Sequence, residues 1–410
     1  MTYIPRHMET VVKRMAQRKA VIVLTGARQV GKSTMLKTIY PEMTYVALNR
    51  PLVRQAALNS PSTFFEDYPP PVIVDEIQKV GELFDYVKDR VDENKEKGQY
   101  FLTGSQSLHL MKNVSESLAG RSGVIKMLGL SCRELDDVNY SKPLTPTRDH
   151  INIMKKQGIA FNYQKTIERI HKGFYPELHE TESSLEDWSD FFSSYLETYI
   201  EKDIRDLLQI QDELAFIQFI RTAAALSGQM LNMNHMSEIC GKDAKTIKRW
   251  ISVLVSSGLV YLLEPYSNNL NKRLIKTPKL YFLDTGLLCW LLGWNTPEQL
   301  KRGAMWGHIF ESFVISEVLK SYYNAGIYRP PLSYYRDKDR NEIDLIIQNG
   351  DILHPIEIKT TSDPSCSDIS AFKLLNCVPA MQRGTGAVIC MAKDPLPLSE
   401  TDTIMPTRFI

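Results

Sequence analysis

The sequence predicts an α/β protein in which a mostly parallel sheet at the amino-terminal end is followed by further domains. Two observations predict the sheet: short β-branched runs alternate with stretches of helical periodicity, and the first run leads directly into a glycine-rich turn. The third observation is length, because 410 residues exceed what one hydrophobic core usually serves. We therefore expect several domains.

The composition is that of an ordinary folded protein, with 43% hydrophobic and 24% charged residues. A formal net charge of +1 excludes a strong overall attraction to nucleic acid or to an anionic membrane, so any nucleic-acid contact must come from local patches. The six cysteines are scattered, with no close metal-ligand pair, and are expected to be reduced. No stretch of about 18 apolar residues occurs. We expect a cytoplasmic protein with no membrane partner.

The first domain is predicted over residues 1–138. Apolar residues recur at helical spacing over 8–18, and AVIVLT at 20–25 has the β-branched character of a buried strand. Four further strands are expected, at 43–48, 71–76, 99–105 and 124–130. Because helical stretches separate these strands, they should form a mostly parallel five-stranded core.

The turn after the first strand reads GARQVGKS, which fits the pattern G-x-x-x-x-G-K-[ST] and opens a helix. Such a loop surrounds phosphates with backbone N–H groups, and the helix dipole adds positive charge. We expect Lys32 to reach the β- and γ-phosphates, Ser33 to ligate Mg²⁺ and Thr34 to lie near the α-phosphate. The residues predicted to contact the Mg-nucleoside triphosphate are Gly26, Ala27, Arg28, Gln29, Val30, Gly31, Lys32, Ser33 and Thr34.

Two acidic residues, Asp75 and Glu76, end a predicted strand at the edge of the sheet where open α/β sheets bind ligands. We expect Asp75 to hold Mg²⁺ through water and Glu76 to orient or deprotonate the attacking water. Thr103 and Ser105 end the next strand. A hydroxyl there either contacts the γ-phosphate or the water, or simply belongs to the turn that ends the strand.

Arg121 lies just before the last predicted strand of this domain. It is either an arginine finger that neutralises transition-state charge on a neighbouring subunit's nucleotide, or a surface arginine that caps the C-terminus of a helix. The first alternative requires a homo-oligomer.

The segments GARQVGKST, VIVDEIQKV, FLTGSQ and SLAGR resemble the bacterial and archaeal AAA-type ATPases whose C-terminal half is a domain of unknown function. The resemblance continues through FYPEL, ETYIEKDIRDL, TIKRW and KTPKLYFLDTGLL, so it covers nearly the whole chain. It implies ATP as the nucleotide, Glu76 as the catalytic base and room for an oligomeric assembly. These ATPases have an extra strand between the phosphate loop and the Mg-binding acid, and we expect the strand at 43–48 to supply it.

A linker and helical neck are predicted over 139–212. The Ser-, Pro- and Thr-rich stretch at 139–150 indicates an irregular connector, and long helical periodicity follows from residue 163. Within that helical stretch, Glu201 is placed to pair with Arg205 one turn later.

A winged-helix domain is predicted over 213–284, because residues 235–262 indicate a helix, a turn with glycine, a second helix and a strand. The second helix should bury one apolar face, formed by Ile247, Ile251, Leu254 and Val255. The residues predicted to contact DNA are Lys242, Lys245, Lys248 and Arg249 on or beside this helix, and Lys272, Arg273, Lys276 and Lys279 in the wing. The alternative is a domain that binds protein or only braces the nucleotide domain.

The last domain is predicted over 285–410 and carries one candidate metal site. Glu311 lies on a predicted helix, Asp344 in a strand pattern, and Glu357 and Lys359 on one face of the next strand. Two or three acids of this kind hold Mg²⁺ ions that activate water, while the lysine orients the nucleophile.

This set resembles the PD-(D/E)XK nuclease family, with Ile343 in place of the usual proline before Asp344. The resemblance implies an α/β nuclease-like domain with Asp344 and Glu311 as metal-binding acids and Glu357 and Lys359 as the E-x-K pair. The alternative is a nuclease-like fold that is retained for assembly.

Together these features predict an ATP hydrolase whose nucleotide state gates DNA engagement or cleavage by the winged-helix and nuclease-like modules. ATP and Mg²⁺ are the expected cofactors, and DNA the expected partner. The rival hypothesis is a regulatory or signalling switch that binds a protein partner and has no nuclease activity. A kinase or ligase is disfavoured, because nothing resembles a small-molecule acceptor site and Glu76 suits water as the nucleophile.

Overall fold

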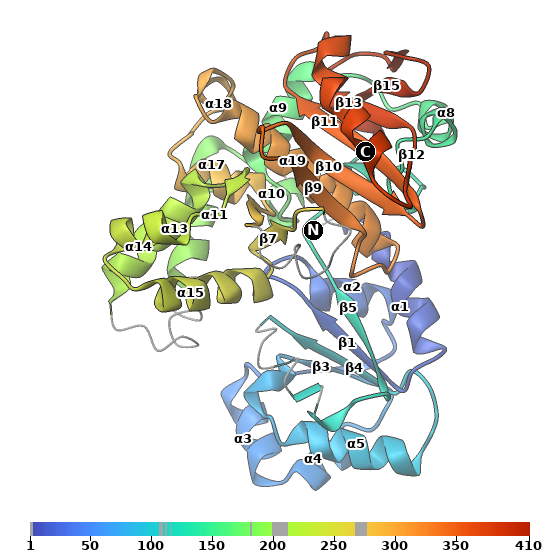
Figure 1. Ribbon diagram of the computed structural model, residues 1–410. Helices are drawn as coiled ribbons and strands as arrows, with labels where there is room; N and C mark the ends of the chain where they lie inside the picture. The colour runs from blue at the N-terminus through green and yellow to red at the C-terminus, as the bar shows by residue number, and fades with distance from the viewer. Residues whose placement is uncertain are drawn as a thin grey trace.

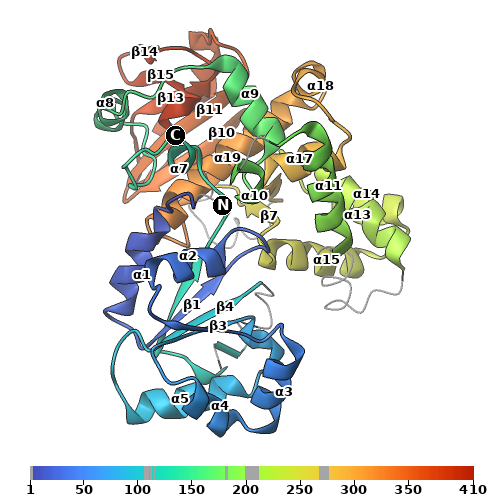
Figure 2. The same ribbon diagram turned by 180° about the vertical axis from the view of Figure 1, so that it is seen from behind.

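The computed structural model consists of three parts that meet near the amino terminus. The amino-terminal sheet lies at one end, the C-terminal sheet lies at the other, and a helical middle part projects to one side (Figure 1). The view from behind shows the same arrangement (Figure 2). The structure describes residues 3–105, 110, 113–114, 116–180, 183–198, 212–266 and 277–410.

The amino-terminal sheet has five parallel strands in the order β2-β3-β4-β1-β5. Its strands are β1 Val21–Thr25, β2 Thr44–Ala47, β3 Val72–Asp75, β4 Tyr100–Gly104 and β5 Ser122–Lys126. All five predicted strands are therefore present. However, the strand at 43–48 is not the extra strand between the phosphate-loop strand and the strand that carries the Mg-binding acid. β4 lies between β1 and β3, whereas β2 is an edge strand.

β5 begins and ends earlier than the predicted 124–130. Beyond it, the carbonyl oxygens of Leu128 and Gly129 accept hydrogen bonds from the guanidinium of Arg6, at 2.8 and 3.0 Å. Past the sheet, these carbonyl groups are therefore satisfied by a side-chain donor in place of a neighbouring strand.

Helices cover both faces of this sheet, as a fully buried parallel sheet requires. They are α1 Met8–Ala16, α2 Lys32–Ile39, α3 Pro51–Asn59, α4 Pro61–Asp67 and α5 Leu83–Glu93. Side chains of β1 alternate between the faces: Ile22 and Leu24 belong to the core that contains α1 and α2, whereas Val21 and Val23 pack with α3, α4 and α5. The predicted first helix ends two residues earlier than expected.

Short helices connect this sheet to the rest of the chain. They are α7 Cys132–Leu135, α8 Arg148–Lys156, α9 Tyr163–Lys172, α10 Glu177–Glu180 and α11 Leu185–Tyr195. The prediction of an irregular connector was wrong for its last three residues, because Thr147 caps the N-terminus of α8. α9 contacts both α17 (Thr285–Leu291) and α18 (Pro297–Arg302). The predicted Glu201–Arg205 pair lies outside the described residues.

In the described residues from 212 to 282, the middle part has the helices α13, α14 and α15 and a three-stranded antiparallel sheet in the order β6-β8-β7. Its elements are α13 Glu213–Ala225, β6 Gln229–Met230, α14 Met233–Cys240, α15 Ala244–Ser256, β7 Val260–Leu263 and β8 Lys279–Phe282. α15 buries Ile247, Ile251 and Leu254 as predicted, but Val255 is 37% exposed. Trp250 takes its place, because it lies on the helix face defined by 247, 251 and 254.

The C-terminal sheet is mixed, with the order β14-β15-β13-β11-β10-β9 and β12 paired to β11. Its main strands are β9 Leu332–Arg336, β10 Glu342–Asn349, β11 Ile352–Lys359, β13 Gly386–Cys390 and β15 Asp402–Pro406, with the short β12 Gln382–Arg383 and β14 Leu396–Pro397. The long helix α19 (Trp306–Asn324) contacts both β8 and β11. Of the helices described, none combines the length and the apolar character needed to cross a bilayer.

Backbone hydrogen bonds join the middle sheet to the C-terminal sheet. The N–H of Tyr266, just after β7, donates to the carbonyl oxygen of Tyr334 in β9 at 2.6 Å, and the N–H of Tyr334 donates to the carbonyl oxygen of Glu264 at 3.1 Å. In addition, Ser316 Oγ on α19 donates to the carbonyl oxygen of Leu283 at 2.6 Å. The middle and C-terminal parts therefore share a continuous hydrogen-bonded framework.

Candidate functional site

The glycine-rich loop between β1 and α2 has a backbone that only glycine accommodates at two positions. Gly26 has φ 151° and Gly31, which caps α2, has φ 92°. A Cβ atom on Gly26 would lie 2.1 Å from the carbonyl oxygen of Met127. The loop leads into the first turn of α2, whose N–H groups lack helical partners and favour an anion.

Lys32 lies in the first turn of α2 with its side chain buried against the loop. Its Nζ donates to the carbonyl oxygens of Gly26 and Ala27, at 3.0 and 2.6 Å. Burial lowers the pKa of Lys32 to about 8, against the opposing effect of the nearby Glu76 and Asp75 carboxylates. A phosphate would compensate the burial of this ammonium better than carbonyl groups do.

Asp75 gathers three hydroxyl groups at the end of β3. Ser33 Oγ donates to Oδ1 at 2.8 Å and the Tyr45 hydroxyl donates to Oδ2 at 2.7 Å, while Thr103 Oγ1 also contacts Oδ1. The two predicted Mg²⁺ ligands, Ser33 and Asp75, are therefore in direct contact. The hydroxyl of Thr103 is directed to this carboxylate.

Glu76 follows Asp75 in a left-handed backbone conformation, with φ 58°. Gln78 Nε2 donates to its Oε2 at 2.5 Å, and Ser105 Oγ donates to the same oxygen at 3.3 Å. A non-glycine residue in this conformation is strained, and such residues concentrate at functional sites. The carboxylate at the predicted catalytic position is thus held by two donors, of which Gln78 was missed from the sequence.

Arg6 is a further residue that the sequence did not reveal. Although it precedes α1, its buried guanidinium donates to the carbonyl oxygen of Val30 inside the loop at 2.9 Å. Its Nε lies 3.1 Å from Glu134 Oε1. The start of the chain therefore braces the loop. A lone arginine before a helix gives no local signal of this contact.

A hollow with mostly apolar walls opens beside the loop at Gly31 and Thr34. It lies where the amino-terminal segment, the chain that follows β5, and α10 with the residue before it come together. Its lining residues are Tyr3, Ile4, Arg6, Gly31, Thr34, Leu130, Pro176 and Glu180. A nucleotide whose phosphates lie in the loop could place its base in this hollow.

Arg121 lies away from this loop. It precedes β5, whose first residue pairs with the first residue of β1, whereas the loop follows the last residue of β1. Its guanidinium pairs with the carboxylate of Asp92, at 2.5 and 2.7 Å. Arg121 therefore lies at the amino ends of the strands, whereas its own chain's loop lies at their carboxyl ends. Its role as an arginine finger stays a prediction about the nucleotide of a neighbouring subunit.

The structure brings together the four residues predicted as a nuclease site and adds two others. The acid cluster, as we call it, consists of Glu311 on α19, Glu342 and Asp344 on β10, and Glu357 on β11. Lys279 from β8 points into it: its Nζ lies 2.9 Å from Glu311 Oε1, 2.5 Å from Glu342 Oε1 and 3.9 Å from Asp344 Oδ1.

Burial and mutual repulsion perturb the titration of this cluster. Desolvation and the charge of Asp344 raise the pKa of Glu311 to about 7 and that of Glu357 to about 8. Burial disfavours the charged form of Lys279, but the surrounding carboxylates outweigh it and raise the pKa of Lys279 above its usual value. Lys359 Nζ pairs with Glu357 Oε1 at 2.8 Å. In the part of the chain that is described, no three His, Cys, Asp or Glu side chains are grouped to hold a metal ion.

The predicted DNA contacts divide into three groups. Lys245, Lys248 and Arg249 are exposed on α15. Two lysines are already paired: Lys242 Nζ lies 2.6 Å from Asp212 Oδ2, and Lys279 is buried in the acid cluster, so its prediction as a phosphate contact was wrong. Lys272, Arg273 and Lys276 lie outside the described residues.

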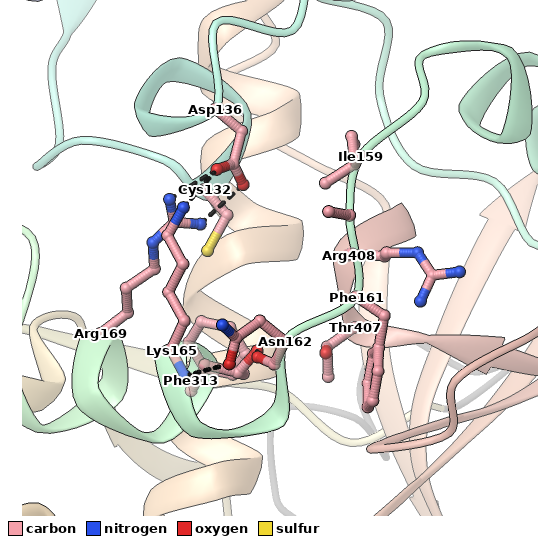
Figure 3. Close-up of a pocket in the computed structure, with 12 residues that line it drawn as sticks. Cys132, Asp136, Ile159, Phe161, Asn162, Lys165, Arg169, Phe313, Thr407 and Arg408 are labelled. Carbon is pink, nitrogen blue, oxygen red and sulfur yellow. Dashed lines mark hydrogen bonds and ion pairs between the residues drawn. The ribbon is translucent and has the colours of Figure 1, made fainter.

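Another hollow lies between α7, α9 and the C-terminal residues 407–408 (Figure 3). On one side, Arg169 makes two hydrogen bonds with Asp136, at 2.6 and 2.5 Å, and Lys165 Nζ lies 3.5 Å from the same carboxylate. The guanidinium of Arg408 points away from this group. The charges nearest the hollow are thus largely paired with one another.

Comparisons with known proteins agree with the geometry of the loop. Residues 18–136 match the family model described as an AAA domain. Residues 163–298 and 306–410 match two models described as domains of unknown function, DUF8612 and DUF4143. The matched AAA segment contains the loop, Asp75, Glu76 and Arg121.

Relatives and solved structures add little beyond this. The uncharacterized protein Rv2008c of Mycobacterium tuberculosis is 27% identical over 402 residues, covering 96% of this chain and 82% of the relative. The Walker-type ATPase PABY2304 of Pyrococcus abyssi gives a TM-score of 0.40 at 14% identity over 69% of this chain and 94% of that one. The Thermotoga maritima RuvB Holliday junction branch migration motor gives 0.28 at 16% identity over 62% and 86%. Scores this low support no argument about arrangement or function.

The assignment therefore rests on the matched domains and on the loop itself. Its glycine backbone, buried lysine and neighbouring carboxylates have the arrangement that an AAA domain uses to bind a nucleotide. The amino-terminal part of the chain, residues 18–136, is therefore an AAA-type P-loop domain of the kind that binds ATP, and residues 306–410 form a C-terminal domain of unknown function.

Proposed function

We propose that this protein is a Mg-dependent ATP hydrolase whose nucleotide state controls how its middle and C-terminal parts engage DNA. The observation that carries the proposal is the 2.8 Å contact between Ser33 Oγ and Asp75 Oδ1, beside the buried Lys32. A hydroxyl and a carboxylate form the hard oxygen pair that Mg²⁺ prefers, so the donor set fits this ion. Bound there, Mg²⁺ supplies charge neutralisation on the β- and γ-phosphates.

The residues around this pair suit transfer of a phosphoryl group to water. Lys32 would exchange its two carbonyl partners for phosphate oxygens, which compensates its burial. Glu76 would orient the attacking water and accept its proton, while Ser105 and Gln78 position the carboxylate. Because Gln78 occupies one oxygen of Glu76 in this conformation, we expect this contact to change when the nucleotide binds.

The hollow beside Thr34 supports adenine as the base. Tyr3, Ile4, Leu130 and Pro176 offer an apolar surface on which a purine can stack, next to the residue expected near the α-phosphate.

A small cavity supports coupling between the nucleotide and the middle part. Loop residues Ala27 and Val30 line it together with Gly258 and Leu259, which lie between α15 and β7, and with Asp284, which caps α17. Any movement of the loop on nucleotide binding would change contacts with these elements directly.

The order of elements in the middle part supports a winged-helix assignment. It is helix, strand, helix, helix, strand, strand, with the three strands in one antiparallel sheet. α15 takes the place of the recognition helix and exposes Lys245, Lys248 and Arg249. These cations are available for phosphate contacts on duplex DNA.

A second function is favoured by one observation, the lysine inside the acid cluster. With Lys279 among the carboxylates, the C-terminal part suits a regulatory switch without nuclease activity, in which ATP changes the binding of a protein partner. DNA stimulation of ATP hydrolysis separates the two functions.

The test measures ATP binding and hydrolysis by the full chain, with and without duplex DNA and with Mg²⁺ or Mn²⁺. Lys32→Ala should lose ATP binding, whereas Glu76→Gln should bind ATP and lose turnover by about 10²-fold or more, the usual effect of removing a general base. Parental hydrolysis by Glu76→Gln would show that the base is another residue. An ATPase rate unaffected by DNA, with no cut product in either metal, would favour the switch.

A further inference from the structure

The acid cluster lies in the fold where a nuclease of the family resembled would hold a divalent metal. We infer that the ammonium group of Lys279 is the resident cation of this cluster, and that it fastens the middle sheet to the C-terminal sheet in place of a metal ion. This inference does not depend on nucleotide binding or hydrolysis.

The position of Lys279 is the first support. Its side chain is only 5% exposed, and its Nζ lies within 4 Å of three carboxylates that come from two different elements, α19 and β10. An ammonium inserted this deeply requires compensation by acids, since an unpaired buried charge is very costly. The contacts are therefore those of a built cation site whose occupant is part of the chain.

The remaining oxygens of the cluster are the second support, because protein donors already use several of them. Tyr281, two residues from Lys279 on the same face of β8, donates to Glu311 Oε1 at 2.6 Å. The N–H of Ile358 donates to Asp344 Oδ2 at 2.9 Å, and Lys359 occupies Glu357 Oε1. Three oxygens of the cluster accept no hydrogen bond from the described residues: Glu357 Oε2 is buried without a partner, Asp344 Oδ1 lies 3.9 Å from Lys279 Nζ, and Glu311 Oε2 lies 4.0 Å from His308 Nδ1. A metal ion held by them would share the cluster with the Lys279 ammonium, which already contacts two of the three carboxylates involved.

The contacts of Lys279 argue against a resident metal ion in the acid cluster. A divalent ion at the mouth of this cluster would face a fixed ammonium at a distance of a few ångströms, and the described residues offer no three-ligand group for it. The residues present fit an internal ion pair network, and they do not fit a metal centre in this conformation.

The elements that meet at the cluster explain what the lysine does there. Lys279 and Tyr281 belong to the middle sheet, whereas their acidic partners belong to the C-terminal part. Asp284, five residues after Lys279, accepts a hydrogen bond from the N–H of Phe174 at 2.7 Å and lines the cavity shared with the phosphate loop. The segment KLYFLD thus connects the acid cluster to the neighbourhood of the nucleotide.

The inference is tested by titrating Mn²⁺ into nucleotide-free full-length protein and counting the bound ion by electron paramagnetic resonance. The parent and all variants carry Ser33→Ala, which weakens metal binding at the phosphate loop. Lys279→Met removes the charge but keeps the stem, and it should gain one Mn²⁺ site at least about tenfold tighter than the parent, because a like charge has been removed from the site. Adding Asp344→Asn should abolish that site. The matched control Lys279→Arg keeps the cation and should gain none.

Two results would overturn the inference. One is a parent protein that binds Mn²⁺ with unit stoichiometry and loses it on Asp344→Asn, since the metal would then be the resident cation. The other is a folded Lys279→Met variant that gains no site. If Lys279→Met is too unstable to titrate, its thermal unfolding decides: Mn²⁺ should raise the midpoint of this variant and leave the parent unchanged, and failure to do so counts against the inference.

Discussion

Arg6 Nη1 donates to the carbonyl oxygen of Val30 at 2.9 Å, so the segment before the first helix holds the middle of the phosphate loop. The same guanidinium compensates the buried carboxylate of Glu134. Arg6→Met should therefore lower the free energy of unfolding by about 3–5 kcal/mol, the usual cost of leaving one member of a buried pair alone. Urea denaturation measures it, with Arg6→Lys expected to be intermediate. Equal stability of Arg6→Met and the parent would contradict this role.

Gly26→Ala should weaken ATP binding, because the new Cβ would lie 2.1 Å from the Met127 carbonyl oxygen and the backbone there has φ 151°. Strain of this kind costs about 1–3 kcal/mol, or roughly 5- to 150-fold in the dissociation constant. Gly120→Ala is the matched control: φ is 77°, but the Cβ would meet no atom within 4 Å. Calorimetric titration of both variants with ATP compares them, and equal affinities would show that the loop does not need this close approach.

Arg121 should act on the nucleotide of a neighbouring subunit if it is an arginine finger, since it lies at the opposite end of the strands from its own loop. Arg121→Ala and Glu76→Gln should each lose ATP hydrolysis. Mixed in equal amounts, they should recover part of it, because some interfaces then combine an intact Arg121 with an intact Glu76. Asp92→Ala, which frees the arginine from its ion pair, should not reduce the rate. An inactive mixture that forms oligomers would support the structural alternative.

Replacing Lys245, Lys248 and Arg249 together by alanine should reduce the salt dependence of DNA binding. Each lost phosphate contact lowers the slope of log K against log salt by about 0.9, so the triple variant should lose up to about 2.7. Lys242→Ala is the control, because that ammonium already pairs with Asp212. Fluorescence anisotropy at several salt concentrations gives the slopes. An unchanged slope for the triple variant would remove α15 from the DNA contact.

Acid should destabilise the protein through His150, whose ring is buried and bonded to the carbonyl oxygen of Phe409 at 2.8 Å. Burial lowers the pKa of His150 to about 4, so the unfolded chain binds the proton more readily. Stability is therefore present above about pH 6.5 and is lost as the pH falls toward 4, by up to about 3 kcal/mol. His150→Gln should flatten this dependence in thermal unfolding at pH 7 and pH 4.5. A parallel decline of both proteins would exclude His150 as the cause.

Features carried by short sequence windows were predicted well. The loop before Lys32 and the acids that end β3 are defined by neighbouring residues, and the structure places Ser33 against Asp75 accordingly. The order of strands was not predictable in the same way, because neither β2 nor β4 carries a local signal of its spatial neighbour. α8 was missed although Thr147 is a favourable cap, since the proline and serine before it dominated the composition.

Residues that act across long sequence separations stayed hidden. Arg6 contacts Glu134, which is 128 positions away, and Lys279 contacts Glu311, 32 positions away. Tyr45 reaches Asp75 only because β2 and β3 are neighbours. None of these side chains has a local signal of its partner, so only the folded arrangement reveals it.

The backbone hydrogen bonds that join Tyr334 to Glu264 and Tyr266 have a mechanical consequence. They splice two sheets edge to edge, so a displacement that begins at Gly258, close to the phosphate loop, cannot be absorbed between the sheets without breaking main-chain bonds. We therefore expect the α15 cations and the carboxylates around Lys279 to move as one rigid unit. The distance between two fluorescent labels within this unit should stay constant through the ATP cycle. The distance between a label in this unit and a label on α5 should change with every turnover.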